Sequence, residues 1–148
     1  MATWIAHMRI AEYFMDNYAS LNNAAFLVGN LGPDCGVPND DWSQFTPDGN
    51  ITHWKTGEKS TIDAEGFKQI YLQSRDEKYP FFLGYYFHLL TDIEWNKLFE
   101  KKKIEPIYAE GLNKDNNFIW VIKKDWYGQD RVYLQEKRES VFLQNFLK

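Results

Sequence analysis

Cysteine is almost absent from this sequence of 148 residues, which contains only Cys35. A single cysteine allows no intrachain disulfide, and this fits a reducing compartment better than a secreted one. Long apolar runs are also missing, since no stretch approaches the ~20 apolar residues of a membrane-spanning helix. In residues 1–10, His7 and Arg9 interrupt the apolar stretch that a signal peptide needs. We therefore expect a cytoplasmic protein without a transmembrane segment.

The sequence also lacks an excess of positive charge, because 17 Lys and Arg stand against 21 Asp and Glu, a formal net charge of −4. Binding to a nucleic-acid backbone depends on a basic surface, so a partner of double-stranded nucleic acid is not expected. One basic run, Lys97 with residues 101–103, follows a long apolar segment. Cations are favourable at a helix C-terminus, and we interpret this run as the end of a helix.

The composition is otherwise that of a folded protein, with 44% hydrophobic and 26% charged residues. A chain of this length fits one domain over residues 1–148 with a single core. Aromatic residues reach 18%. Most of these are expected to pack between helices, and some to wall a pocket.

Apolar residues recur mostly at helical spacing, and no segment shows the alternation of a strand. The predicted fold is therefore all-α. A dense set of Gly, Pro, Asn and Asp between residues 35 and 60 predicts one long irregular loop, and such loops in small domains are often functional. Ser60 or Thr61 is the expected cap of the helix that follows. The predicted helices cover residues 3–21, 24–28 with an end at Gly29, 61–74, 81–103, 116–126 and 131–147.

The sharpest local signal is His88-Leu-Leu-Thr-Asp92 in the predicted helix over 81–103. Residues four apart lie on one helix face with Cβ atoms about 6 Å apart, so both side chains can reach one cation. The surrounding residues are apolar, and a buried carboxylate needs a proton, a basic partner or a metal. The alternative is an ordinary pair of polar residues on a helix surface.

Three further positions are candidates for the same site. His53 lies in the long loop between Thr52 and Trp54. His7 lies beside the apolar face of the first helix, where the alternative is a hydrogen-bonded core histidine. Asp34 follows Gly-Pro and can be aimed inward from a fixed backbone, although a turn or helix-cap aspartate has the same pattern.

Taken together, these segments resemble the zinc-dependent phospholipase C family. The resemblance rests on Ala25-Phe-Leu-Val-Gly-Asn-Leu-Gly-Pro-Asp34, on Ile51-Thr-His53-Trp54, and on Phe82-Leu-Gly-Tyr-Tyr-Phe-His88-Leu-Leu-Thr-Asp92, with His7 matching an early helical histidine. It implies an all-α fold of the phospholipase C and single-strand nuclease type. It also implies a metal site made by Asp34, His53, His88 and Asp92, with Asp92 able to bridge to a second metal near His7.

The later ligands of the three-metal members are missing, because no histidine follows His88 and Trp4 is internal to the sequence. The expected site is therefore a reduced one. If all five candidate side chains bind one ion, an octahedral metal keeps one position for water, and iron, manganese or nickel suit it better than tetrahedral zinc. If Asp92 bridges two ions, a hydroxide between them could attack phosphorus. Zinc is the metal that the resemblance favours.

Two other residues, Asp125 and Cys35, are of types that can take part in chemistry. Asp125, between Lys124 and Trp126, is a candidate added ligand or a base acting through water; the alternative is a solvated turn that ends a helix at Gly128. Cys35 has no histidine placed to activate it, so we expect a small buried residue.

The sequence thus predicts a metal-dependent hydrolase of a small-molecule or lipid-like phosphoester, with Asp34 and Asp125 as the carboxylates expected to take part in the chemistry. A metal lowers the pKa of a bound water from 15.7 to about 7, which supplies a nucleophile at neutral pH. The alternative is a non-catalytic helical protein whose site binds a structural metal or is vestigial.

Overall fold

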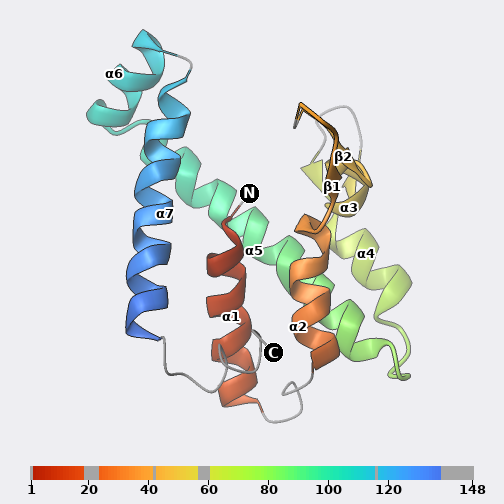
Figure 1. Cartoon of the computed structure of the whole chain (residues 1–148). Helices are drawn as coiled ribbons and strands as arrows, with labels where there is room; N and C mark the ends of the chain where they lie inside the picture. Colours follow the sequence, from red (N-terminus) through yellow and green to blue (C-terminus); the bar gives the residue numbers. More distant parts are fainter. Residues whose placement is uncertain (1, 19–23, 42, 57–60, 116, 138–148) are drawn as a thin grey trace. The chain divides into compact units, whose positions relative to one another are not determined.

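The computed structural model describes residues 2–18, 24–41, 43–56, 61–115 and 117–137. These residues are mostly helical, which confirms the predicted all-α class (Figure 1). The chain divides into two compact units, Met1–Glu94 and Trp95–Lys148. One domain over the whole chain stays a prediction. Within the described residues, no helix is both long and apolar enough to cross a membrane.

The first unit begins with α1 (Trp4–Asn17), which the Thr3 hydroxyl caps by accepting a hydrogen bond from the Ala6 N–H at 3.1 Å. The observed helix ends at Asn17, so it is shorter at its C-terminal end than the predicted helix over 3–21. The buried face of α1 consists of His7, Met8, Ala11 and Glu12. His7 belongs to this buried face, which brings its imidazole into the interior.

Helix α2 (Ala24–Leu31) continues through Gly29, so the predicted end at this glycine is wrong. The reason is tertiary packing: a Cβ at Gly29 would overlap the carbonyl of Phe81, and one at Gly84 would overlap the carbonyl of Phe26. The two glycines let α2 and the long helix α5 (Tyr79–Lys103) approach backbone to backbone. A single 3-10 turn, η2 (Gly32–Asp34), then follows α2.

The segment after η2 is more regular than the predicted loop. Strand β1 (Val37–Pro38) pairs antiparallel with β2 (Phe45–Thr46), and β3 (Lys55–Thr56) with β4 (Thr61–Ile62). Between the pairs lies α3 (Gly49–Thr52), capped by the Asp48 carboxylate. The expectation of no strands is wrong for these pairs, because two-residue strands are too short to show alternation.

Helix α4 (Ala64–Tyr71) is capped by Asp63, whose carboxylate accepts a hydrogen bond from the Gly66 N–H at 2.9 Å. Thr61 belongs to β4 instead, and Ser60 lies outside the described residues. The core between α4 and α5 contains Phe67 and Leu89, with Phe67 stacked on Tyr85 at a centroid distance of 4.8 Å. Part of the aromatic content therefore packs between helices, as the composition predicts, while other rings such as Tyr13 and Trp120 are exposed.

Helix α5 matches the predicted helix over 81–103 and ends in three lysines. The second unit adds α6 (Pro106–Lys114) and α7 (Phe118–Glu136). Because α7 runs through Gly128, the predicted break there is wrong, and the predicted last helix falls partly on residues 138–148, outside the described residues. In this unit Trp126 packs edge-on against Trp95 and Phe99.

Candidate metal centre

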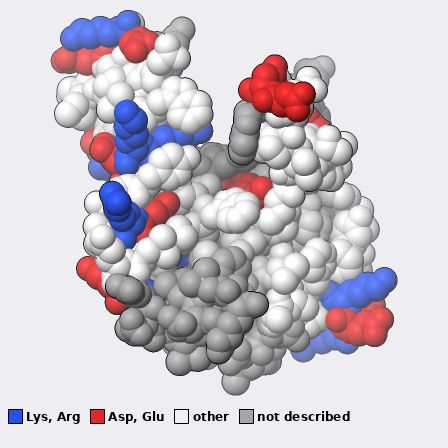
Figure 2. All heavy atoms as spheres, in the orientation of Figure 1, with Lys and Arg blue, Asp and Glu red and all other residues white. Residues whose placement is uncertain are grey.

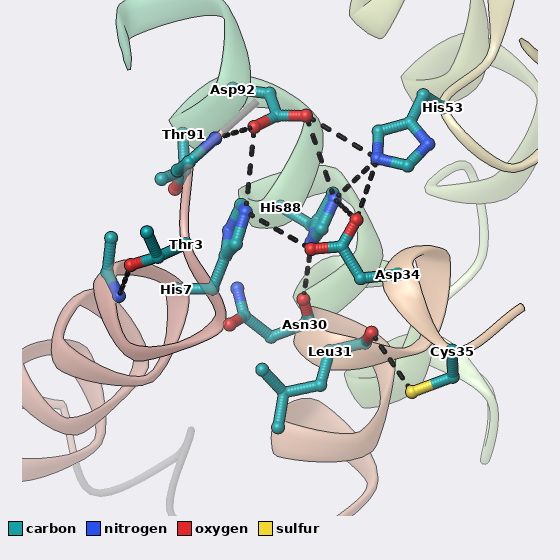
Figure 3. Close-up of polar contacts among 12 residues, drawn as sticks. Thr3, His7, Asn30, Leu31, Asp34, Cys35, His53, His88, Thr91 and Asp92 are labelled. Carbon is teal, nitrogen blue, oxygen red and sulfur yellow. Dashed lines mark hydrogen bonds and ion pairs between the residues drawn. The ribbon is translucent and has the colours of Figure 1, made fainter. Parts of the chain in front are cut away.

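Five side chains of the first unit converge on one point (Figure 3). They come from separate elements: the middle of α1, the end of η2, the residue after α3, and two successive turns of α5. These are the five metal ligands that the sequence predicts, and the fold brings them all together. They are His7, Asp34, His53, His88 and Asp92.

The three imidazoles all direct Nε2 at the centre. His53 Nε2 lies 3.1 Å from Asp34 Oδ1, 3.5 Å from Asp92 Oδ2 and 3.2 Å from His88 Nε2. His88 Nε2 lies 3.9 Å from an oxygen of each carboxylate. His7 Nε2 lies 3.6 Å from Asp92 Oδ1 and 4.0 Å from Asp34 Oδ2. The spacing is that of donor atoms arranged around a common centre.

Main-chain carbonyls determine the tautomers of two histidines. His88 Nδ1–H donates to the Asn30 carbonyl at 2.7 Å, and His53 Nδ1–H donates to the Gly49 carbonyl at 3.0 Å. A carbonyl can only accept, so in each neutral ring the proton is on Nδ1 and the lone pair on Nε2. When both rings are neutral, two lone pairs therefore face each other at 3.2 Å. A cation between the rings would relieve this repulsion, and such carbonyl contacts are typical of metal-binding histidines.

The cluster is buried almost completely. The side chains of His7, His88 and Asp92 are 0% exposed, that of His53 is 3% and that of Asp34 is 10%. Both ring nitrogens of His7 and Oδ2 of Asp92 have no hydrogen-bond partner in the described structure. A buried polar atom without a partner costs about 1–3 kcal/mol. A metal ion fits two of these three atoms, because it would bind His7 Nε2 and Asp92 Oδ2.

The electrostatics keep the donors in their ligand forms. Burial, together with the neighbouring His7, lowers the pKa of His88 to about 4. Burial alone would raise the pKa of Asp92, yet the nearby His7 imidazole and a 2.6 Å hydrogen bond from the Ala2 N–H lower it to about 2. At neutral pH, therefore, His88 is a neutral imidazole and Asp92 a carboxylate, the states that bind metals.

The donor spacing can be compared with that around one metal ion. With metal–ligand bonds of about 2.1 Å, adjacent donors of an octahedral ion lie about 3.0 Å apart and opposite donors about 4.2 Å apart. The donor pairs given above span 3.1–4.0 Å. Two overlapping groups of three, His7/His88/Asp92 and Asp34/His53/His88, also satisfy metal-ligand spacing. The two groups share His88, an arrangement that fits one ion or two ions that share a ligand.

Comparison with known proteins adds no relative. No protein-family model, curated protein or solved structure matches this chain. The resemblance to zinc-dependent phospholipases C therefore stays a prediction from the motifs.

A small cavity of about 130 Å³ adjoins the cluster on the side of Asp34 and His53. These are the two ligands whose side chains retain some exposure. Among the described residues, the remaining walls are apolar side chains and backbone with one hydroxyl, and none of these residues is Lys or Arg. They are Pro33, Gly36, Phe45, Pro47, Gly49 and Thr52. The cavity therefore lies on the most exposed side of the cluster.

Two supporting residues were not anticipated from the sequence. Asn30 is fully buried and supplies the carbonyl that holds His88. The Tyr85 hydroxyl donates to the Thr52 carbonyl, next to His53, and burial raises the pKa of Tyr85 to about 12. Tyr85 precedes His88 by three residues on one helix, which is the only signal that could have singled it out. Asn30 gives no signal, since its role depends on the main chain.

Asp125 and Cys35 differ from the five ligands. Asp125 lies on α7 in the second unit with an exposed side chain, and its role in the chemistry stays a prediction. Cys35 is exposed, so the prediction of a buried cysteine is wrong. It follows the η2 turn that directs Asp34 inward, and its own side chain consequently lies outside the cluster. Partial burial and the Asp34 charge raise the pKa of the thiol, which fits the expected lack of activation.

Proposed function

We propose that this chain is a metal-dependent phosphoesterase that holds one divalent ion with His7, Asp34, His53, His88 and Asp92. The observation that carries the proposal is the pair of facing Nε2 atoms of His53 and His88, each with its proton held on Nδ1 by a carbonyl. Three imidazoles and two carboxylates form a donor set that suits Zn²⁺, Fe²⁺, Mn²⁺ or Ni²⁺. Zinc is favoured by the motif resemblance.

The five ligand side chains differ in their exposure to solvent. His7, His88 and Asp92 close the inner side and exclude water, since their side chains are 0% exposed. Asp34 is the most exposed ligand and lines the cavity, so its carboxylate is the one best placed to accept a proton from water. A divalent metal held here would supply Lewis-acid activation of water for attack on phosphorus.

The cavity also bears on the substrate. Among the described residues, its lining offers apolar contacts and main-chain groups but no cationic side chain. A small or lipid-like phosphoester, whose phosphoryl charge is met by the metal and whose remainder is apolar, fits this lining better than a polyanion. The resemblance to zinc-dependent phospholipase C points to the same class.

A second function is supported by the extent of burial. With exposures of 0–10%, the cluster also has the character of a structural site that ties α1, η2, α3 and α5 together. In that case the bound ion would stabilise the fold, and the protein would have no hydrolytic activity.

The deciding experiment measures metal content and hydrolysis on the same preparation. The purified chain, loaded with each candidate metal, is assayed with a chromogenic phosphodiester and a phosphomonoester. We expect near-stoichiometric metal and activity that chelation removes, with both lost in His88→Ala and both retained in the exposed control Asp16→Asn. Bound metal without activity on either ester would favour the structural site, and a folded protein that binds no metal would end both proposals.

A further inference from the structure

The segment of residues 101–107, from the end of α5 to the start of α6, exposes two large apolar side chains. We call it the α5–α6 tip. Its Ile104 is 81% exposed and its Ile107 is 73% exposed, the highest values among the large hydrophobic residues that the structure describes. Single exposed apolar residues are ordinary, but two isoleucines at one turn, separated by Glu105 and Pro106, form a projecting apolar edge.

Basic side chains adjoin this edge. Lys101, Lys102 and Lys103 end α5 and are all exposed. Lys102 pairs with Glu105 at 2.7 Å and Lys103 with Glu100 at 2.9 Å. Pairs this exposed contribute little free energy, so the ammonium groups can exchange their partners for other anions. Figure 2 shows charged side chains next to uncharged surface over α6.

The charge is distributed unequally between the two units. Residues 95–148 carry eleven Lys and Arg against eight Asp and Glu, whereas residues 1–94 carry six against thirteen. The net charge is therefore positive in the unit that bears the tip and negative in the unit that bears the metal centre. An anionic surface would attract the former and repel the latter, so the distribution favours contact through the tip.

An apolar cavity of about 150 Å³ lies at the same end of α5. Its walls include the rings of Trp95, Phe99 and Trp126, and it shares Lys102 with the tip. An open aromatic cavity beside a cationic side chain suits an amphiphile, because the apolar part is sheltered while the anionic part meets the ammonium group.

We propose that the α5–α6 tip docks the protein on a lipid bilayer that contains anionic phospholipid. Ile104 and Ile107 enter the headgroup region, and the lysines at the end of α5 contact the lipid phosphates. A second copy of the chain is a poorer occupant. A two-fold symmetric contact would place the tip against itself and bring the lysines of both copies together. The proposal concerns binding alone and does not rest on the phosphoesterase activity.

The test is sedimentation of the full chain with vesicles of phosphatidylcholine alone or mixed equally with phosphatidylserine. We expect binding to the mixed vesicles only, weakened by added salt because exposed charges are screened. Ile104→Ser and Ile107→Ser should each lower the partition coefficient roughly tenfold, as expected for an apolar side chain that no longer leaves water. Lys101→Glu should lower it on the mixed vesicles as well.

Ile70→Ser is the matched control, because Ile70 is 62% exposed but belongs to α4 in the first unit. It should bind as the wild type does, and circular dichroism should show that all four variants keep their helices. Equal loss in Ile70→Ser, or no preference for phosphatidylserine, would overturn the proposal. So would a dimer in solution that Ile107→Ser dissociates. Vesicle binding is measured with and without a chelator. It should be the same in both conditions, because the tip contains none of the five metal ligands, and this separates the result from the test of the metal centre.

Discussion

His53 and His88 face each other through Nε2 atoms 3.2 Å apart, although 35 residues separate them in the chain. The contact is unfavourable for two neutral rings, since each Nδ1–H is held by a main-chain carbonyl and each Nε2 carries a lone pair. The fold nevertheless maintains it through α3 on one side and α5 on the other. A bound cation turns this repulsion into ligation, and the predictions on metal binding depend on that change.

His88→Ala and Asp92→Ala should each abolish tight metal binding. Both donors project from one rigid helix, while the remaining ligands come from separate elements that cannot move to replace them. Elemental analysis after dialysis measures the loss. Asp63→Asn, at the cap of α4, is a control outside the cluster and should keep its metal. Unchanged metal in both alanine variants would remove the pair from the site.

The metal-free protein should lose stability as the pH falls. The folded pKa of His88 is about 4, below the ordinary value of 6.5, so the unfolded chain binds more protons in between. This contribution, on the order of 3 kcal/mol, is present above pH 6.5 and is lost as the pH falls toward 4. Asp92, whose folded pKa is about 2 against 3.8, adds a loss of the same sign at lower pH.

Urea unfolding of the chelated protein across this pH range measures the effect. In His88→Gln the ring no longer titrates, so the decline between pH 6.5 and 4 should be smaller than in the wild type. An equal decline in both proteins would assign it to other groups.

Tyr85→Phe should weaken the site without touching a ligand. The Tyr85 hydroxyl holds the Thr52 carbonyl and thereby the turn that presents His53. Its loss should cost about 1–2 kcal/mol of stability and raise the metal dissociation constant roughly tenfold. Tyr86→Phe is the matched control, since Tyr86 is on the same helix and donates only to the exposed carboxylate of Glu65. Equal metal affinity in both variants would reduce Tyr85 to a packing role.

How far the sequence predicts this molecule depends on the range of the interactions involved. The pairing of His88 with Asp92 follows from helix geometry alone, and so does the end of α5 at its lysines. Local propensity predicts that helices end at Gly29 and at Gly128, but α2 and α7 continue through these glycines. At Gly29 the cause is the close approach of α5, a contact between distant segments that local propensity does not contain.

The contacts that support the site also join residues that are distant in the chain, and local sequence does not predict them. Asn30 and His88 are 58 residues apart, and their contact uses a main-chain carbonyl that every residue possesses. No residue type marks such a position in advance. The five ligands could be selected because chemistry limits ligation to few residue types, and this chain has only three histidines.

His7 is the ligand whose removal distinguishes the one-ion from the two-ion arrangement. Its Nε2 lies 3.6 Å from Asp92 Oδ1 and 4.0 Å from Asp34 Oδ2, and its ring stacks on that of His88 with centroids 3.8 Å apart. This proximity to the other ligands favours a single shared ion. His7→Ala should then weaken one site severalfold while the stoichiometry stays at one.

Calorimetric titration of metal into the apo wild type and into His7→Ala decides between the arrangements. His7→Gln serves as a second variant, because it keeps much of the buried volume beside His88 if the alanine variant folds poorly. A wild type with two sites, of which His7→Ala loses one, would establish the two-ion arrangement bridged by Asp92. Identical affinity and stoichiometry in all three proteins would instead make His7 a buried core residue. The single-ion site predicts neither result, since removing one of five donors lowers affinity without changing the count.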